Sequence, residues 1–280
     1  MKGFVFSGPG AGEIANLNEK KPKEGEVLVK VKYCGVCGTD MNIWRGIDRA
    51  ASNIVLGHEF CGTVVETGSG VKAVKVGDRV SIDPNIPCNQ CEYCRRGQIN
   101  LCSGLKAIGV DIDGGFAEYC CVPEKQLYLL PHSMPWEYAA LVEPVACAIN
   151  GINRSDINIG DDVLIYGGGP MGLLMVQLAK LRGAGRVFLC EKTAWRRQVG
   201  TQVGADVAFE SDPAEYFMSN GKYPDVVIEC IGNPQTQREA LQVAKPGGKV
   251  VLFGDGYLNS EFPIPSQLFY SRELTARGAA

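Results

Sequence analysis

The sequence predicts a two-part α/β protein, in which a small irregular β-barrel precedes a parallel sheet that is covered on both faces. Three observations carry this prediction. The first half consists of short alternating segments separated by glycine and proline, the second half repeats strand, glycine turn and helix, and an amphipathic segment lies between them. Because 280 residues are enough for two cores, we expect domains over residues 1–149 and 150–280.

In the first half, apolar and polar residues alternate in a way that predicts strands over 27–33, 61–66 and 78–82. The segment over 135–153 follows a different period. Its apolar residues recur at helical spacing, which predicts one helix that links the two domains; they are Trp136, Ala139, Ala140, Val142, Val145, Ala146 and Ile149.

The second half contains short apolar runs, each followed by a helical pattern. Strands are predicted over 162–166, 186–190, 225–229 and 249–253, and helices over 170–181, 194–203 and 235–244. Apolar strands that alternate with helices of this length are typical of a parallel sheet with helices on both faces.

The overall charge argues against two classes of partner. Lys and Arg number 28 and Asp and Glu number 31, so the net charge is −3 and no basic run is available to bind nucleic acid or a membrane surface. No apolar run has the length of a membrane span, and the first residues lack the apolar core of an export signal. We therefore expect a cytoplasmic protein, in which a count of 12 cysteines indicates metal or thiol chemistry rather than disulfides.

A glycine motif at the start of the second half predicts a dinucleotide site. Gly167, Gly169 and Gly172 have the G-x-G-x-x-G spacing directly after a strand, and Pro170 and Met171 open the helix that follows. The first glycine permits a tight turn, the second admits a pyrophosphate and the third lets the helix pack on the strand.

The next predicted strand is followed by a carboxylate at a position suited to the cofactor. Glu191 lies 19 residues after Gly172, where it would bind the adenosine ribose hydroxyls and repel a 2′-phosphate. We therefore expect NAD rather than NADP. Arg196 is included in the predicted site because a guanidinium can accommodate a 2′-phosphate.

Four cysteines in a loop over 86–104 predict a structural zinc ion. Cys88, Cys91, Cys94 and Cys102 have the spacing C-x2-C-x2-C-x7-C, which fills a tetrahedral shell and leaves no position for substrate. An iron–sulfur cluster and, in an oxidising compartment, disulfides are the alternatives.

A second set of donors is scattered along the sequence. Cys37, His58, Glu59 and Glu143 together supply a thiolate, an imidazole and carboxylates, which suit a zinc ion with one position open for a water or an alcohol. Asp40 could accept the N–H of His58 and fix its tautomer.

These motifs resemble the zinc-dependent medium-chain dehydrogenase superfamily, and the Glu-Pro pair at 143–144 resembles its sorbitol (polyol) dehydrogenase branch. The resemblance rests on residues 35–40 (GVCGTD), 57–59 (GHE), 76–80 (VGDRV), 114–119 (GGFAEY), 143–144, 167–172 and 246–248 (PGG) and on the four-cysteine loop.

The resemblance implies a GroES-like catalytic domain, a Rossmann domain and a homodimer or homotetramer that oxidises a polyol with NAD. Cys37, His58 and Glu59 would bind the catalytic zinc, with Glu143 as a further ligand or the group that positions the zinc-bound water. Thr39 would relay the substrate proton.

Three alternatives stay open. The first is an L-threonine or sugar-phosphate alcohol dehydrogenase, although Asn42 stands where threonine dehydrogenases carry a histidine. The second is a zinc- and NAD-binding protein without activity, because family members continue beyond Gly278. The third is a thiol redox pair formed by Cys34 and Cys37.

Overall fold

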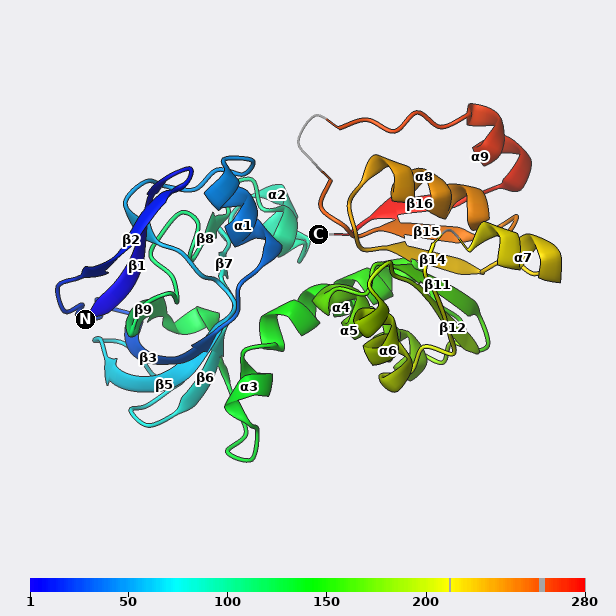
Figure 1. Cartoon of the computed structure of the whole chain (residues 1–280). Coiled ribbons are helices and arrows are strands. Elements are labelled where there is room, and N and C mark those ends of the chain that lie inside the picture. The colour runs from blue at the N-terminus through cyan, green and yellow to red at the C-terminus, as the bar shows by residue number, and fades with distance from the viewer. Residues whose placement is uncertain (212, 257–259, 280) are drawn as a thin grey trace. The chain divides into compact units, whose positions relative to one another are not determined.

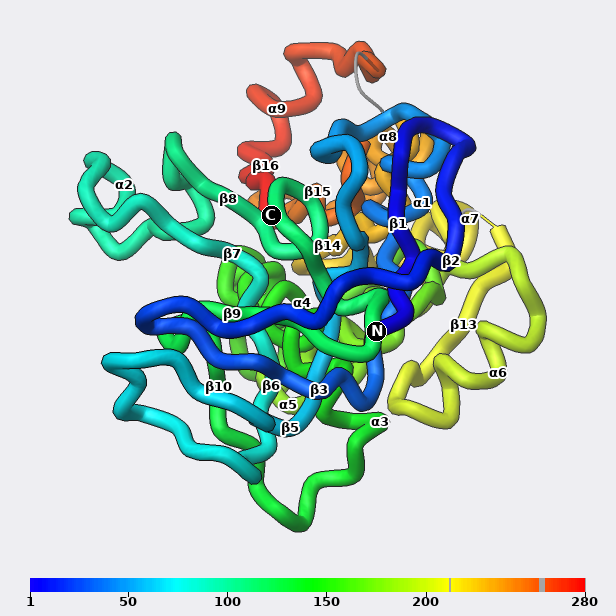
Figure 2. The backbone as a smooth tube through the Cα atoms, turned by 90° about the vertical axis from the view of Figure 1, so that its left-hand side faces the viewer, coloured from blue at the N-terminus to red at the C-terminus, as the bar shows by residue number. Residues whose placement is uncertain are grey.

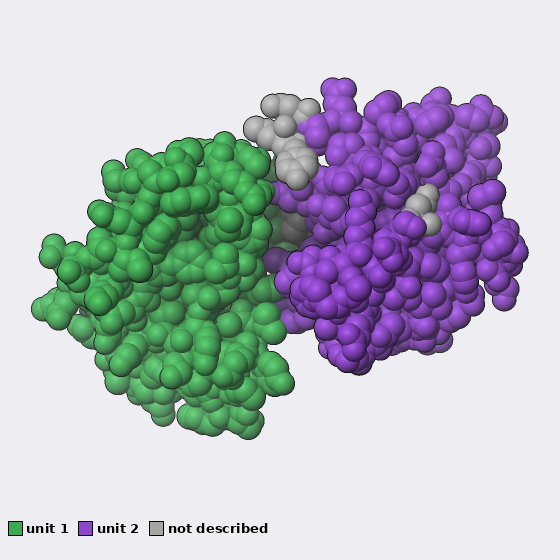
Figure 3. Space-filling model, in the orientation of Figure 1, with its two compact units in different colours: residues 1–144 green, residues 145–280 purple. Residues whose placement is uncertain are grey.

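The computed structural model describes residues 1–211, 213–256 and 260–279. The chain divides into two compact units, Met1–Pro144 and Val145–Ala280, which are coloured separately in Figure 3. None of the helices within these described ranges is long and apolar enough to cross a membrane.

Unit 1 is built around a five-stranded antiparallel sheet, as the alternating segments predict. Its strand order is β10-β6-β5-β3-β9. The strands are β3 (Glu26–Cys34), β5 (Phe60–Thr67), β6 (Arg79–Ile82), β9 (Tyr119–Pro123) and β10 (Leu127–Leu129). One face of β3 is buried at Val27 and Val29, which pack with Phe60 and Val80 to form the core of this sheet.

Smaller elements complete unit 1 (Figure 1). Three further strands form a sheet of order β2-β1-β4, and two form a separate ribbon. Their bounds are β1 (Lys2–Gly8), β2 (Ala11–Asn16), β4 (Ile54–Val55), β7 (Asn85–Ile86) and β8 (Lys106–Ala107). The helices are α1 (Gly38–Arg45), α2 (Glu92–Arg95) and α3 (Trp136–Ala139), with short 3-10 turns η1 (Ile99–Leu101) and η2 (Glu124–Gln126).

The single helix predicted over 135–153 is wrong, because the structure has two helices there. α3 ends at Ala139 and α4 (Val142–Ser155) begins after a break. Pro144 explains the break, since a proline inside a continuous helix lacks the N–H for its hydrogen bond and clashes with the carbonyl four residues earlier. With α4 starting at Val142, Pro144 falls in the first turn, where the backbone N–H groups have no helical partner.

Unit 2 contains a six-stranded parallel sheet of order β13-β12-β11-β14-β15-β16. The strands are β11 (Asp162–Tyr166), β12 (Arg186–Cys190), β13 (Val207–Phe209), β14 (Val226–Glu229), β15 (Lys249–Leu252) and β16 (Thr275–Gly278). The helices that follow are α5 (Pro170–Leu181), α6 (Ala194–Gln202), α7 (Ala214–Asn220), α8 (Pro234–Val243) and α9 (Ser266–Arg272).

Both faces of this sheet are buried, which accounts for the continuous apolar runs in the sequence. Val163 and Ile165 of β11 belong to the core beneath α5, whereas Leu164 and Tyr166 belong to the core beneath α8. In Figure 1, α5 and α6 lie on one face of the sheet and α7, α8 and α9 on the other. The predicted parallel sheet with helices on both faces is therefore confirmed.

Candidate metal centres and cofactor pocket

Strand pairing in unit 1 brings together residues that are about 20 positions apart in the sequence. β3 and β5 run antiparallel, and their last pair is Cys34 with Phe60. The segment that leaves β3 therefore lies beside the segment that enters β5. As a result, one donor atom each of Cys37, His58 and Glu59 lies within 4.8 Å of the other two.

Two glycines make room for this cluster. A Cβ atom on Gly35 would lie 2.2 Å from Oε2 of Glu59, so the carboxylate occupies space that any other residue would fill. Gly57 has a φ of +91°, which side chains rarely adopt, and a Cβ there would lie 2.6 Å from the Phe116 ring. The glycines that flank the donors are therefore a steric requirement of the site.

Asp40 connects two of the donors. Its Oδ2 accepts the backbone N–H of Cys37 at 2.9 Å, and its Oδ1 lies 3.5 Å from Nδ1 of His58. The Asp40 side chain is buried in the first turn of α1, and neither its Oδ1 nor His58 Nδ1 has another partner among the described residues. Thr39 in the same turn places its hydroxyl 3.7 Å from Sγ of Cys37.

The electrostatics of this cluster favour a bound cation. Burial disfavours a charged imidazole, yet hydrogen bonds with Asp40 and Cys37 outweigh it and raise the pKa of His58 to about 10. Burial raises the pKa of Glu59 above its usual value, although His58 and Cys37 act to lower it. The field that holds a proton on His58 would equally attract a metal ion, and a thiolate, an imidazole and a carboxylate are a zinc donor set.

Glu143, the fourth donor expected from the sequence, lies in the first turn of α4 and is half-buried. It is not one of the three residues whose donor atoms converge. Its part in the site stays a prediction.

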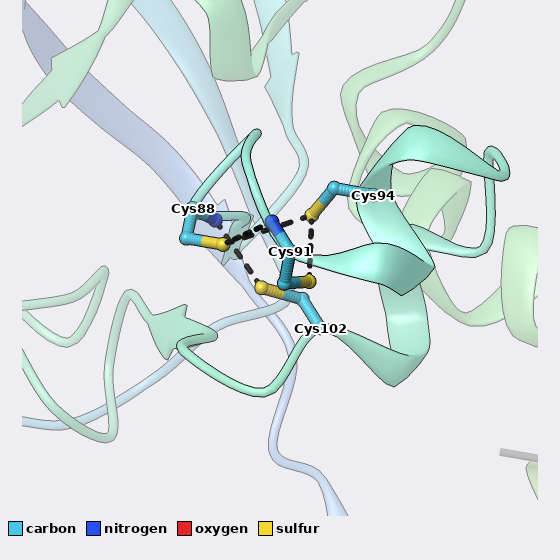
Figure 4. A group of neighbouring side chains, drawn as sticks. All are labelled: Cys88, Cys91, Cys94 and Cys102. Carbon is cyan, nitrogen blue, oxygen red and sulfur yellow. Dashed lines mark hydrogen bonds between the residues drawn. The ribbon is translucent and has the colours of Figure 1, made fainter.

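The four-cysteine loop folds into a cluster of sulfur atoms (Figure 4). The Sγ atom of Cys94 lies 3.5 Å from that of Cys91 and 4.0 Å from that of Cys88. Tetrahedral coordination at the usual zinc–sulfur distance would separate the sulfurs by about 3.8 Å. The donor atoms of Cys88, Cys91, Cys94 and Cys102 all lie within 4.8 Å of one another, which fits one ion better than a cluster whose thiolates bind different iron atoms.

The backbone of this loop is arranged to support thiolates. The N–H of Cys88 donates to Sγ of Cys102 at 3.2 Å, and the N–H of Cys91 donates to Sγ of Cys88 at 3.4 Å. Backbone N–H groups of Cys94 and Ser103 lower the pKa of Cys91 to about 6. Cys88, Cys91, Cys94 and Cys102 are all described and all are thiols, so the disulfide alternative does not occur in this loop.

The lobe that carries these cysteines has almost no apolar core. Its helix α2 and its turn η1 contain no buried residue. Figure 2 shows α2 near the end of a loop that extends from the rest of unit 1. In a segment with so little hydrophobic packing, a bound metal ion would supply much of the folding free energy.

The glycine motif of unit 2 forms the predicted turn between β11 and α5. Gly167 has a φ of +96°, and a Cβ on Gly172 would lie 1.7 Å from the carbonyl oxygen of Gly167. Gly169, the residue before α5, has open space where a Cβ would be. The first glycine thus makes the turn, the third permits close packing of helix on strand, and the second leaves the approach to the helix N-terminus open.

Glu191, the residue after β12, accepts a hydrogen bond from the glycine turn. Its Oε2 accepts the N–H of Gly168 at 2.7 Å and its Oε1 accepts the N–H of Thr193 at 2.7 Å. Burial of the carboxylate acts to raise the pKa of Glu191, but these N–H donors and Arg196 outweigh it and lower the pKa below its usual value. Nη1 of Arg196 lies 4.0 Å from the carboxylate.

These residues line a pocket of about 640 Å³ within unit 2. Gly167, Gly169, Glu191 and Arg196 of the predicted site are in its lining, whereas Pro170, Met171 and Gly172 are not. The opposite wall was not predicted from the sequence; it follows β14 and consists of Cys230, Ile231, Asn233, Gln235, Thr236 and Glu239. The pairing of β14 with β11 brings this wall to the motif, and only the Asn-Pro start of α8 marks it in the sequence.

Comparison with known proteins gives matches to both units. The family model described as the alcohol dehydrogenase GroES-like domain matches residues 23–132, and that described as zinc-binding dehydrogenase matches residues 170–280. An L-threonine 3-dehydrogenase of Pyrococcus horikoshii is 41% identical over 91% of this chain and 76% of that protein. A sorbitol dehydrogenase of Halalkalibacterium halodurans is 35% identical over 91% of this chain and 77% of that protein.

Solved structures agree with these matches. A zinc-binding dehydrogenase from Sinorhizobium meliloti, bound to NADP, has a TM-score of 0.96 and 38% identity over 99% of this chain and 83% of that one. A short chain alcohol dehydrogenase from Escherichia coli, complexed with NADH, has a TM-score of 0.93 and 33% identity over 100% of this chain and 83% of that one.

Proposed function

The chain belongs to the zinc-dependent alcohol dehydrogenase family, which combines a GroES-like and a Rossmann-type domain, and we propose that it oxidises a secondary alcohol with NAD as hydride acceptor. The observation that carries this proposal is the convergence of Cys37, His58 and Glu59 at the paired ends of β3 and β5, with Asp40 behind them.

The proposal assigns two zinc ions. Cys88, Cys91, Cys94 and Cys102 would hold one that stabilises the lobe, and Cys37, His58 and Glu59 would hold the other, with Glu143 as a further ligand or a group that orients a bound water. The second ion, when bound, supplies a Lewis acid that lowers the pKa of the alcohol oxygen.

The residues of the chain do the rest of the chemistry in this proposal. Asp40 fixes the orientation of His58 and of the Cys37 backbone. The Thr39 hydroxyl would accept the proton that the alcohol loses and pass its own proton to solvent, and NAD, when bound, would supply the acceptor for the hydride.

The same pocket supports the proposal of NAD rather than NADP. The Glu191 carboxylate would accept the ribose hydroxyls and repel a 2′-phosphate, which favours NAD. Arg196 lines the pocket as well and is the residue on which any use of NADP would depend.

We propose a polyol or sugar alcohol as the substrate, because Asn42 occupies the position of the histidine found in threonine dehydrogenases and Glu143-Pro144 resembles the polyol branch. L-Threonine is the second candidate, and the observation that favours it is the 41% identity to a named L-threonine 3-dehydrogenase.

A substrate panel tests these proposals. Formation of NADH would be followed with sorbitol and other polyols, their phosphates and L-threonine, with zinc added, for the wild type and for Cys37→Ser. Turnover of polyols that Cys37→Ser abolishes is the expected result. A preference for threonine or for phosphorylated alcohols would replace the substrate proposal, and NAD binding without any turnover would mean that the chain is a binding protein.

A further inference from the structure

A buried carboxylate in unit 2 has no part in the mechanism proposed above. Glu229 is the last residue of β14 and has no exposed surface. None of the ion pairs found among the described residues includes it, and burial raises its pKa. A buried carboxylate without a cation is costly, so its retention requires several hydrogen-bond donors.

Those donors all come from the segment that follows β14. The Oε1 atom accepts the N–H of Ile231 at 2.8 Å and the hydroxyl of Thr236 at 2.9 Å. The N–H of Gly232 points between the two oxygens, at 3.0 Å from Oε1 and 3.1 Å from Oε2. One side chain therefore ties the turn after β14 to the first residues of α8.

The same residue also holds the neighbouring turn. Its backbone carbonyl accepts the N–H groups of Phe253 and Gly254, which follow β15. Gly232 has a φ of +80°, and a Cβ there would lie 2.2 Å from the carbonyl oxygen of Asp255. The turn after β14 is thus held by Glu229 on one side and by the backbone after β15 on the other.

This turn is the wall of the pocket that lies across from Glu191. Ile231, Asn233 and Thr236 line the pocket, whereas Glu229 itself does not. Ile231 is 46% exposed although it is apolar, and its backbone N–H is bound to Glu229. Glu229 holds two lining residues, Ile231 and Thr236, without lining the pocket, so any effect that it has on a ligand acts through them.

We propose that Glu229 is a positioning residue for the dinucleotide, which holds the β14–α8 turn in the conformation that binds the adenosine half. This rests on the proposed function, since it takes the pocket as the cofactor site. Glu191 identifies the adenosine end, because a carboxylate at this strand end is the group that binds the adenosine ribose. A substitution of Glu229 should therefore weaken the binding of cofactor fragments that lack nicotinamide as much as the binding of NAD itself.

The test is the affinity of the zinc-loaded full chain for NAD+, NADH and ADP-ribose, measured by calorimetry for the wild type and for Glu229→Gln. The amide presents an NH2 group where Oε2 accepts, so the Gly232 N–H keeps only its contact with Oε1, and all three donors then face a neutral oxygen instead of a carboxylate. The expected result is a Kd about tenfold higher for all three ligands, with kcat at saturating NAD+ unchanged.

Two results would overturn the proposal. A lower melting temperature with unchanged Kd values would make Glu229 a structural residue only. A loss confined to NAD+ and absent for ADP-ribose would mean that its charge acts on the nicotinamide. Failure of the wild type to bind any of the ligands would instead contradict the proposed function.

Thr236 provides a second approach if Glu229→Gln does not fold. Thr236→Val removes the hydroxyl that donates to Glu229, whereas Thr236→Ser keeps it, so only the valine variant should raise the Kd for ADP-ribose. Thr201→Val removes a hydroxyl from the exposed face of α6 and is the matched control. Equal Kd values for Thr236→Val and Thr201→Val would contradict the proposal.

Discussion

Asp40 positions two donors of the proposed metal site, although it is not one of the three donors that converge there. It accepts the N–H of Cys37 and faces Nδ1 of His58, so it fixes two of the three converging donors. The sequence indicated a role next to His58. The bond to the Cys37 backbone follows from the position of Asp40 in the first turn of α1, three residues after the N-cap.

We predict that Asp40→Asn lowers kcat/KM by about 10- to 100-fold and weakens zinc binding at this site, as losses of such supporting carboxylates do. The measurement is kcat/KM together with zinc content at increasing chelator concentration. Asp78→Asn is the control, because Asp78 accepts the N–H of Lys75 in the same i−3 arrangement but outside the site. Equal effects of the two substitutions would contradict the role assigned to Asp40.

The lowered pKa of Glu191 predicts that the stability of the folded chain depends on pH. Its pKa is lowered in the folded chain, so between the usual value of 4.5 and the lowered value the unfolded chain binds more protons. The contribution of Glu191 to stability is therefore complete above pH 4.5 and is lost as pH falls through the lowered pKa. Urea unfolding across this window should show a steeper loss for the wild type than for Glu191→Gln, and parallel curves would contradict the assignment.

At the scale of single elements, the turn between β11 and α5 contains glycines with two different functions: one permits close packing and the other leaves room for a ligand. A methyl group on Gly172 would collide with the backbone of Gly167, whereas one on Gly169 meets open space. Both glycines belong to one sequence motif, yet only the packing distinguishes the glycine that the fold requires from the one that leaves room for a ligand.

We predict opposite outcomes for the two alanine variants. Gly172→Ala should destabilise the chain by about 1–3 kcal/mol, because backbone must shift to admit the methyl group. Gly169→Ala should keep the wild-type melting temperature and raise the Kd for NAD+, because its methyl group occupies the approach to the helix N-terminus. Thermal unfolding and calorimetric titration measure the two effects, and a destabilised Gly169→Ala would contradict this division.

The proposed structural zinc ion would hold the four-cysteine lobe together, because α2 and η1 bury no residue. We predict that Cys94→Ser lowers the zinc content by one ion per chain and exposes the loop to proteolysis at 86–104, with the Kd for NAD+ unchanged. Cys121→Ser is the control, because Cys121 lies in β9 and belongs to neither donor group. Full zinc content in Cys94→Ser would contradict the assignment.

At the scale of the whole molecule, each unit has a core of its own. Val27, Val29 and Phe60 are in the core of unit 1, whereas Val163 and Val226 are in that of unit 2. The proposed zinc sites have their converging donors in unit 1, and the glycine motif lies in unit 2.

We therefore predict two transitions in a calorimetric unfolding scan, one that a zinc chelator lowers and one that NAD+ raises. At a free NAD+ concentration 100 times its Kd, the second transition should gain about 2.7 kcal/mol of unfolding free energy. A single transition that responds to both ligands would mean that the units unfold together.

The sequence by itself determined the parallel sheet, the glycine turn and the four-cysteine lobe. In each of these the interacting residues are close in the chain or repeat with the period of one element, so local spacing is sufficient information. The break between α3 and α4 was missed, although Pro144 marks it, because the apolar period continues across it.

Only the tertiary structure decided which distant residues meet. The register of β3 with β5 brings Cys37 to His58 and Glu59, and the pairing of β14 with β11 supplies the pocket wall that Glu229 holds. A strand register is set by packing over the whole sheet, and a shift of one residue would turn each side chain to the other face. Local spacing does not contain that information, and the grouping of Cys37, His58 and Glu59 was expected only from their donor chemistry and from the family resemblance.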